Sequence, residues 1–440
     1  MPGNHLNMKK DIAVIVLAAG KSTRMRSETP KVLHNICGRP MLGYVFDLVA
    51  SLSPARSVAV LGFKHEMVSG AVPDGVKIAV QKKLQGTADA IKAGLKSLKG
   101  FSGTVLVLYG DNPLLRKETL KKLIAYHKQS GADATLLTAE LKKPSGYGRI
   151  IRDKYFSICG IVEEKDADEA QKDIKEINTG IMAFKKRSLD KYLGRIRNNN
   201  RKKEYYLTDM IGILSAKGCL VEGLKAEDAD EGLGINTRQE LSRADSLIRR
   251  RINEGLMRKG VSIIDPDSTF ICFDAKIGAD TVIYPFTVVE RNVKIGRHCS
   301  VGPFAHLREG TELKDGVTAG NFIEISRSRV GASTFVKHFS YLGDSSLGSR
   351  VNIGAGTVTA NFDGFNKHKT VIKDNARIGS DTIIVAPVVI GANAVTGAGS
   401  VVTKDVPGSA VVAGVPARNL KKKTLSAGLP VARRVGGRNG

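Results

Sequence analysis

The first part of the chain, up to about residue 236, alternates between two hydrophobic patterns. Short continuous apolar runs such as IAVIVLAAG, VLVLYGD and TLLTAEL are typical of buried strands. Amphipathic stretches such as KETLKKLIAYHKQ are typical of helices between such strands. The alternation predicts a Rossmann-like α/β domain, in which helices flank a mostly parallel sheet. We expect this domain to occupy residues 11–236.

Residues 237–260 carry a different pattern, with many charges and apolar residues at helical spacing. The apolar positions include Leu241, Ala244, Ile248 and Ile252. This spacing predicts one long helix that links two domains.

From residue 261 onward the hydrophobic pattern repeats every six residues. An apolar or small residue occupies nine successive positions without a slip: Ile277, Ile283, Val289, Ile295, Val301, Leu307, Leu313, Ala319 and Ile325. The repeat then shifts by one residue twice and resumes at Ile378, Ile384, Ile390, Thr396 and Val402. A six-residue period is the signature of a left-handed parallel β-helix, in which three hexads close one coil and the apolar residue points inward.

The expected β-helix spans residues 261–416. A sandwich of short strands is the alternative, and nine unbroken steps argue against it. The repeat is interrupted by TANFDGFNKHKT, residues 359–370, which we expect to be a loop that leaves the coil. Loops of this kind on a rigid scaffold often carry function.

Composition narrows the classes of protein to consider. The 440 residues are 42% hydrophobic and 25% charged, which is ordinary globular usage, and no apolar run approaches the ~18 residues of a membrane span. We therefore expect no membrane insertion. The start of the chain lacks an apolar signal core, and its five cysteines are scattered without metal-ligand spacing, so we expect a cytoplasmic protein with reduced thiols.

The net charge of +25 is the unusual global feature. Part of it lies in residues 417–440, which hold seven lysines and arginines and no acidic residue, and which we expect to be a disordered tail. There is no tryptophan and no basic stripe interleaved with aromatic residues, so we expect no nucleic-acid partner. Anionic small-molecule substrates account for the charge better.

Phosphate-binding chemistry is indicated by the segment LAAGKSTRMRSETPKVL after the first expected strand. A glycine-containing basic loop at that place can present backbone N–H groups and the cations of Lys21, Arg24 and Lys31 to phosphates. The segment lacks the spacing of a P-loop, which argues against a kinase or an ATPase. Asp111 ends another expected strand, where a carboxylate can hold Mg²⁺ or simply cap a helix or form a turn.

Further motifs follow in order: QKKLQGTADA, GYGRI, IVEEKDA, EINTGI and GLGIN. With the first loop, the linker helix and the hexapeptide repeat, this set resembles the bifunctional N-acetylglucosamine-1-phosphate uridyltransferase / glucosamine-1-phosphate N-acetyltransferase family of bacterial cell-wall precursor synthesis. The resemblance extends from about residue 11 to about residue 405. It implies acetyl transfer from acetyl-CoA to glucosamine-1-phosphate, followed by Mg²⁺-dependent uridylyl transfer from UTP to N-acetylglucosamine-1-phosphate with release of pyrophosphate. It also implies a homotrimer.

The resemblance assigns residues to the uridyltransferase site. Arg24 and Lys31 would act on the phosphates, and Asp111 and Asn236 would hold Mg²⁺. The remaining nucleotide and sugar contacts would be Leu17, Ala18, Ala19, Gly20, Gln81, Gly86, Thr87, Tyr109, Gly110, Gly148, Glu163 and Asn178. No protein nucleophile is needed, because such a transfer depends on positioning and charge neutralisation.

The resemblance also assigns an acetyltransferase site on the β-helix. His338, in VKHFSYLGD, would be the base that takes a proton from the amine of the acceptor. Arg308, Tyr341, Asn352 and Lys367 would bind the acceptor sugar phosphate. Acetyl-CoA would contact Ala355, Asn361, Phe362, Ser380 and Ala398.

One position departs from the family pattern. The family has a lysine two residues after Glu324, whereas this chain has Ser326, followed by Arg327. Arg327 is a candidate substitute, although neighbouring residues on a strand face opposite sides. The departure leaves one alternative open, a monofunctional nucleotidyltransferase with a non-catalytic trimerising β-helix. A regulatory subunit that senses sugar nucleotides without catalysis is a third possibility, and the presence of Arg24, Lys31, Asp111 and Asn236 together argues against it.

Overall fold

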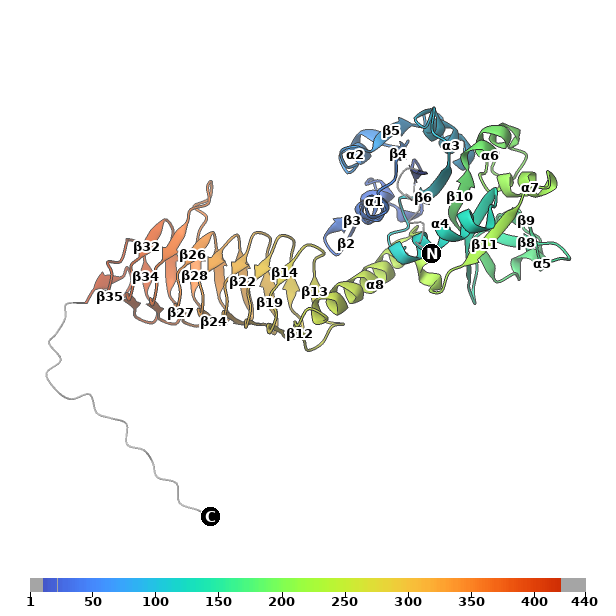
Figure 1. Ribbon diagram of the computed structural model, residues 1–440. Helices are drawn as coiled ribbons and strands as arrows, with labels where there is room; N and C mark the ends of the chain where they lie inside the picture. The colour runs from blue at the N-terminus through green and yellow to red at the C-terminus, as the bar shows by residue number, and fades with distance from the viewer. Residues whose placement is uncertain (1–10, 22, 421–440) are drawn as a thin grey trace, which may run out of the picture. The chain divides into compact units, whose positions relative to one another are not determined.

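The computed structural model describes residues 11–21 and 23–420 (Figure 1). Its chain divides into two compact units, the first ending at Arg249 and the second beginning at Arg250. Most of the basic tail, residues 421–440, lies outside the described residues.

The first unit is built on one large sheet with the strand order β11-β7-β10-β6-β1-β4-β5. Neighbouring strands are parallel except at β10, which runs antiparallel to both β6 and β7. A β8–β9 hairpin extends the sheet from β10. The strands are β1 (Ile12–Ala18), β4 (Arg56–Leu61), β5 (Lys77–Val80), β6 (Thr104–Tyr109), β7 (Ala134–Glu140), β8 (Arg149–Arg152), β9 (Ile158–Val162), β10 (Glu176–Lys185) and β11 (Val221–Lys225).

Both faces of this sheet are covered, which explains the continuous apolar runs in the sequence. Alternate residues of β1 point to opposite sides, with Ile15 in one hydrophobic core and Val14 and Val16 in the other. The covering helices are α1 (Met41–Leu52), α2 (His65–Ser69), α3 (Thr87–Lys96), α4 (Lys117–Ser130), α6 (Lys186–Tyr192) and α7 (Asp209–Ala216), whereas the short helix α5 (Glu169–Lys172) has no buried residue. Short elements complete the unit: η1 (Thr23–Met25), η2 (Lys31–Leu33), β2 (Asn35–Ile36), β3 (Arg39–Pro40), η3 (Leu193–Arg195) and η4 (Ala229–Gly232).

The long helix α8 (Arg238–Met257) crosses the boundary between the two units. Its buried residues include Ala244 and Ile248, two of the apolar positions that indicated a helix. Near its C-terminal end, Asn253 is fully buried and its Nδ2 donates to the backbone carbonyls of Pro266 and Thr269, at 2.9 and 3.1 Å. Of the described helices, none combines the length and the apolar composition that crossing a membrane requires.

The second unit is a β-helix with three sheets, in which the strands from β12 to β34 pair in parallel with the strand three further along the chain (Figure 1). At the C-terminal end, β35 pairs in parallel with β33, and β36 pairs antiparallel with β35. The first sheet contains β12 (Ser262–Ile263), β15 (Val282–Ile283), β18 (Ser300–Val301), β21 (Thr318–Asn321), β24 (Phe335–His338), β27 (Asn352–Ile353), β30 (Arg377–Ile378), β33 (Val395–Thr396), β35 (Val411–Ala413) and β36 (Arg418–Asn419). The second contains β13 (Phe270–Ile271), β16 (Val288–Val289), β19 (Ala305–Leu307), β22 (Ile323–Ser326), β25 (Tyr341–Gly343), β28 (Val358–Ala360), β31 (Ile383–Val385) and β34 (Val401–Val402). The third contains β14 (Lys276–Ile277), β17 (Lys294–Ile295), β20 (Glu312–Leu313), β23 (Arg329–Val330), β26 (Ser345–Leu347), β29 (Thr370–Ile372) and β32 (Val388–Ile390).

The hexad residues line the inside of this coil, which confirms the expected left-handed β-helix. Eight of the nine positions between 277 and 325 are buried, and Ile277 in the first coils is partly buried. The shifts of the repeat have a structural cause. Early partners such as Val289 and Leu307 lie 18 residues apart, whereas Leu313 pairs with Val330, which is 17 residues further on. One corner has therefore lost a residue.

Candidate active sites

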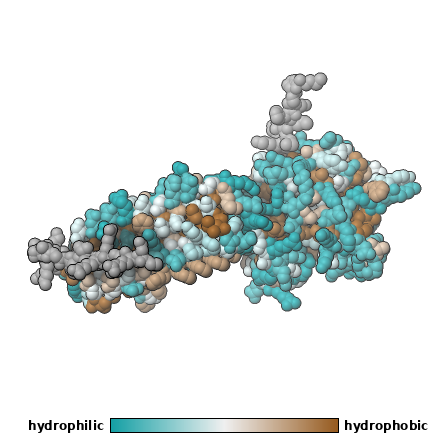
Figure 2. All heavy atoms as spheres, turned by 90° about the horizontal axis from the view of Figure 1, so that it is seen from below, coloured by the Kyte–Doolittle hydropathy of each residue, from teal (hydrophilic) through white to brown (hydrophobic). Residues whose placement is uncertain are grey.

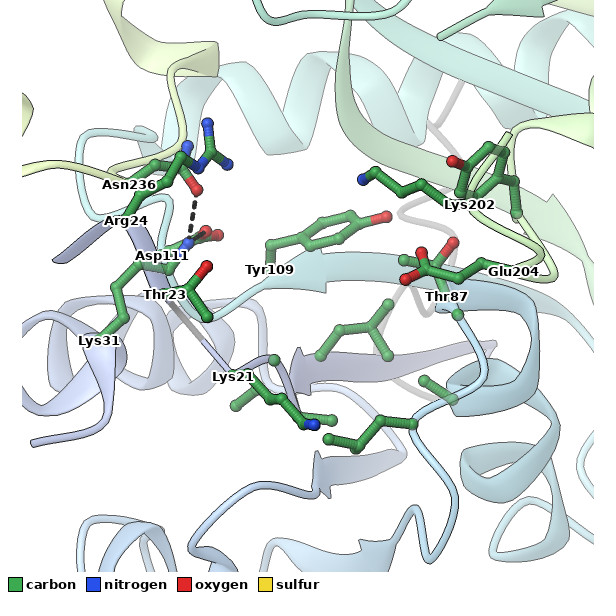
Figure 3. A pocket seen from close by; sticks show the side chains of 18 of the residues that line it. Lys21, Thr23, Arg24, Lys31, Thr87, Tyr109, Asp111, Lys202, Glu204 and Asn236 are labelled. Carbon is green, nitrogen blue, oxygen red and sulfur yellow. Dashed lines mark hydrogen bonds and ion pairs between the residues drawn. The ribbon is translucent and has the colours of Figure 1, made fainter. Parts of the chain in front are cut away.

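A cleft of about 820 Å³ opens in the first unit, at the carboxyl ends of β1 and β6. Ligands of open α/β sheets bind at this edge, because the loops that follow the strands meet there. Leu17 to Lys21 line one wall, and Tyr109 and Asp111 line another (Figure 3). Arg24, Lys31 and Asn236 lie close to Asp111 at one side of the cleft, while Lys202 and Glu204 lie at the other.

Lys31 is the centre of the first group. Its Nζ donates to Oδ2 of Asp111 and, at 2.8 Å, to Oδ1 of Asn236. The side chains of Lys31 and Asp111 are only 12% and 16% exposed. Asn236 is held in this orientation because its Nδ2 donates to the carbonyl of Gly234 at 3.0 Å, which leaves Oδ1 facing the ammonium. A carboxylate oxygen and an amide oxygen thus converge on one cation.

This arrangement fits the Mg²⁺ that the sequence implied. Mg²⁺ prefers oxygen ligands and is commonly held by one or two carboxylates together with substrate phosphates. Asp111 and Asn236 offer two such oxygens, and the Lys31 ammonium lies where they converge. Within residues 11–21 and 23–420, no group of three or more His, Cys, Asp or Glu side chains is placed to hold a metal ion.

A second wall of the cleft joins two segments that are far apart in the sequence. Gln81 is buried, and its Nε2 donates to the carbonyl of Gly86 at 3.0 Å and to Oδ2 of Asp89 at 2.9 Å. Thr87 accepts from the backbone N–H of Leu207 at 2.8 Å. Gly86 has φ +118, and a Cβ there would lie 2.5 Å from the carbonyl oxygen of Tyr205. Only glycine allows this close approach of the two chains.

Glu163 marks the other end of the cleft. Burial raises the pKa of its carboxyl group, and Oε1 accepts from the Thr208 hydroxyl at 3.0 Å. Gly148 lies beside it, since a Cβ on Gly148 would be 3.6 Å from the Glu163 carboxylate. Asn178 donates its backbone N–H to the carbonyl of Gly148 at 2.9 Å. Between the two ends, burial raises the pKa of the Tyr109 hydroxyl.

Most of the residues assigned to the uridyltransferase site therefore line one cleft. Three of the assigned residues do not line the cleft: Gly110, Gly148 and Asn178. Gly110 instead donates its backbone N–H to Leu17, at 2.9 Å, and so holds the two strand ends together. Gly148 lies against the Glu163 carboxylate, and Asn178 is hydrogen-bonded to Gly148.

Sequence reasoning missed several residues of the cleft wall. These are Thr23, Pro30, Val32, Leu84, Ala90, Gly146, Glu164, Lys165, Lys202, Glu204 and Tyr206. The ammonium of Lys202 lies 5.9 Å from the centre of the Tyr206 ring and points into the cleft toward Tyr109 (Figure 3). The segment RKKEYYLTD gives no local signal of this role, because charged and polar residues are usual in surface loops.

The second group of assigned residues lies on the β-helix. His338 ends β24, is exposed, and pairs in register with Asn321 of the preceding coil. Tyr341 begins β25 and pairs with Glu324. Nη1 of Arg308 donates to Oε1 of Glu324 at 2.9 Å. Arg308, Glu324 and Tyr341 therefore lie close together on one outer face, and Glu324 is held by Arg308.

Asn352 lies on the neighbouring face, beside Phe335 and Arg377 of the adjoining coils. The loop between β28 and β29 carries Asn361, which is buried, and Phe362, which is 60% exposed and forms a bridge with Lys367.

The residues assigned to coenzyme binding stack at one corner of successive coils. Asp381 donates its backbone N–H to the carbonyl of Ala355 at 2.6 Å, and Gly399 donates to that of Ser380 at 2.8 Å. Ala398 precedes Gly399. Ala355, Ser380 and Ala398 thus form one column of small residues.

Taken together, a nucleotide-binding type of α/β unit and a hexapeptide β-helix define a transferase with two catalytic units. The family profile of the MobA-like NTP transferase domain matches residues 14–166. That of the bacterial transferase hexapeptide (six repeats) matches residues 274–321 and 369–404.

Full-length relatives agree with these matches. The chain is 46% identical to the bifunctional protein GlmU of Thermosipho africanus (strain TCF52B), over 89% of this chain and 92% of the relative. It is 45% identical to that of Syntrophotalea carbinolica (strain DSM 2380 / NBRC 103641 / GraBd1), over 92% and 95%. It is 42% identical to that of Brevibacillus brevis (strain 47 / JCM 6285 / NBRC 100599), over 91% and 94%. The chain belongs to the family of bifunctional GlmU proteins, as the sequence motifs predicted.

Proposed function

We propose that this chain makes UDP-N-acetylglucosamine in two steps, one in each unit. In the β-helix, acetyl-CoA acetylates glucosamine-1-phosphate. In the α/β unit, N-acetylglucosamine-1-phosphate attacks the α-phosphate of UTP and pyrophosphate leaves. The observation that carries the proposal is the convergence of Lys31, Asp111 and Asn236 in one cleft, in a chain whose family combines both units.

In the α/β unit, the residues act by positioning and by neutralising charge. Lys21, Arg24 and Lys31 lie where the triphosphate of UTP needs countercharge. Gln81, Gly86 and Thr87 form the wall for the base, and Glu163 accepts hydrogen bonds from sugar hydroxyls. Mg²⁺, held by Asp111 and Asn236, would neutralise phosphate charge. The oxygen of the sugar phosphate forms the new bond to the α-phosphate as the bond to the β-phosphate oxygen breaks.

In the β-helix, the exposed ring of His338 takes the proton of the acceptor amine. The amine nitrogen bonds to the thioester carbonyl carbon, and the coenzyme thiol leaves with its electron pair and a proton. Arg308, Tyr341, Asn352 and Lys367 surround the acceptor. Asn361 and Phe362 bind the acetyl-CoA side, next to the column of small residues that gives the coenzyme close access to the coil.

We further propose that three copies of the chain associate along one corner of the β-helix. Phe286, Phe304 and Phe322 stack there in successive coils, with ring centres 4.9 Å apart. They are 55%, 44% and 60% exposed. Hydrophobic patches are visible on the β-helix unit (Figure 2). An exposed aromatic stack is suited to burial against other copies.

The oligomer is tested by sedimentation of Phe304→Asp, with Phe365→Asp as the control. Phe365, at 91% exposure, lies in the loop between β28 and β29 and away from the stack. The first variant should lose the trimer and the second should keep it. A trimer in both would overturn this assignment. We also propose a cytoplasmic location, in keeping with five free cysteines and small-molecule substrates.

The proposed function is tested by two assays on the wild-type protein. Thiol release from acetyl-CoA with glucosamine-1-phosphate measures the first step. Pyrophosphate release from UTP with N-acetylglucosamine-1-phosphate measures the second. The proposal requires turnover in both. Pyrophosphate release without thiol release would instead support a monofunctional nucleotidyltransferase with a trimerising β-helix.

A further inference from the structure

Arg327 occupies the corner of the β-helix that directly follows β22. Its guanidinium donates from Nε to Oδ1 of Asp344 at 2.7 Å and from Nη2 to Oδ2 at 2.9 Å. Nη1 donates to the hydroxyl of Ser326 at 2.8 Å. Ser326 is itself almost completely buried. The guanidinium is therefore already engaged by three oxygens of the protein, in a two-point geometry that lysine cannot reproduce.

Asp344 lies at the same corner of the next coil. Its backbone N–H donates to the carbonyl of Ser326 at 3.0 Å. Its carboxylate accepts from Nδ2 of Asn361 as well as from Arg327. Its backbone carbonyl accepts from the N–H of Thr370 at 3.3 Å. Asn361 and Thr370 flank the loop between β28 and β29, so one aspartate fastens both ends of that loop.

The interior of the loop is organised separately. Oδ1 of Asp363 accepts from the backbone N–H groups of Phe365 and Asn366, at 2.8 and 2.6 Å, and its Oδ2 lies 2.6 Å from Nε2 of His368. The backbone N–H of His368 donates to the carbonyl of Asn361 at 2.7 Å. The loop therefore has a local shape of its own, and its attachment to the coil depends on the corner at Asp344.

Charge supports this attachment. The hydrogen bond from Arg327 is the main cause that lowers the pKa of Asp344, and the Asn361 amide lowers it further. The Asp344 carboxylate is thus held ionised between two donors. Without Arg327, the carboxylate would retain Asn361 and the charge of Lys367 but lose the cation that is hydrogen-bonded to it.

We propose that Arg327 is a positioning residue for acetyl transfer, which acts through Asp344 to hold Asn361 and the base of the loop, and that it does not bind the acceptor phosphate. This inference rests on the proposed acetyltransferase activity. It also accounts for the serine at position 326, where the family has a lysine. The small buried serine leaves space for the guanidinium and accepts one of its hydrogen bonds. The countercharge for the acceptor then falls to Arg308 and Lys367.

The test compares Arg327→Met and Arg327→Lys with Arg350→Met. Arg350 is a matched control, since it also has positive φ at a β-helix corner and donates from Nε to Oδ1 of Asn375 at 2.8 Å, away from the loop. Hydrogen exchange of residues 361–370 and steady-state acetyl transfer are measured for each protein.

For Arg327→Met we expect exchange in the loop to accelerate at least tenfold, and the KM for acetyl-CoA to rise about tenfold with a smaller rise in the KM for glucosamine-1-phosphate, because Arg327 also interacts with Tyr341. Arg327→Lys should recover only part of both effects, and Arg350→Met should resemble the wild type. Normal loop exchange together with a raised KM for glucosamine-1-phosphate would overturn the inference, because it would show a direct phosphate contact. Absence of acetyl transfer in the wild type would refute the proposed function and the positioning role of Arg327 in it, while the exchange data would still decide whether Arg327 holds the loop.

Discussion

Replacing Lys31 with methionine should have opposite effects on metal binding and on catalysis. The Lys31 ammonium is bonded to both Asp111 and Asn236, the two residues proposed to hold Mg²⁺. A metal ion must therefore displace this ammonium before it can use those oxygens. Methionine keeps most of the side-chain volume and removes the competing charge.

The magnitude follows from the bonds that are lost. A hydrogen bond to a charged group contributes roughly 1.5–3 kcal/mol, so freeing Asp111 and Asn236 should tighten Mg²⁺ binding by about ten- to a hundredfold. The reaction, in contrast, loses a cation aimed at phosphate charge that develops in the transition state. Losses of that kind cost about 10²–10³ in kcat.

Calorimetric titration of Mg²⁺ into nucleotide-free protein measures the first effect, and pyrophosphate release measures the second. Lys202→Met is the control for metal affinity, because Lys202 lines the same cleft on the side away from Asp111 (Figure 3). Unchanged or weaker Mg²⁺ binding in Lys31→Met would refute the reasoning, since it would mean that the ammonium does not occupy the cation position.

Two further predictions concern the α/β unit. Burial lowers the pKa of His127 from 6.5 to about 4, so the unfolded chain binds a proton that the folded chain does not, and stability is lost as the pH falls between those values. The loss in the free energy of unfolding amounts to at most ~3 kcal/mol. The melting temperature of His127→Gln should therefore approach that of the wild type as the pH falls from 7.5 to 4.5. A difference in melting temperature that stays constant over this range would show that protonation of His127 does not destabilise the wild type. In Gly86→Ala, the added Cβ meets the backbone of Tyr205, so the KM for UTP should rise about tenfold or more. Gly100→Ala, which also has positive φ but open space around it, should leave the KM unchanged, and equal effects in both would exclude the clash.

The hexapeptide repeat was visible in the sequence because each coil repeats the same local requirement. Ile283 and Val301 are buried at the same place in successive coils, so the period alone revealed their role. The α/β unit could also be predicted, because its buried strands are continuous apolar runs in the sequence. The pairing of Asp111 with Asn236 was predicted only through the resemblance, since 125 residues separate them in the chain.

Other features depend on tertiary contacts that no local pattern contains. Lys202 and Tyr206 reach the cleft because their segment packs on Gly86, which the polar sequence around them does not indicate. The pairing of Arg327 with Asp344 depends on the loss of one residue from a coil, which brings two corners 17 residues apart into register. The expectation that Arg327 faces away from the site, as the next residue on a strand, does not apply, because β22 ends at Ser326 and Arg327 has positive φ.

The central claim is that one chain holds two separate active sites that work in sequence, and a mixing experiment tests it most directly. His338→Ala and Asp111→Ala are purified separately and supplied with glucosamine-1-phosphate, acetyl-CoA and UTP. Neither variant alone should form UDP-N-acetylglucosamine, and their mixture should form it, because each supplies the step that the other lacks. A mixture of folded variants that stays inactive, or a single variant that completes both steps, would contradict the account.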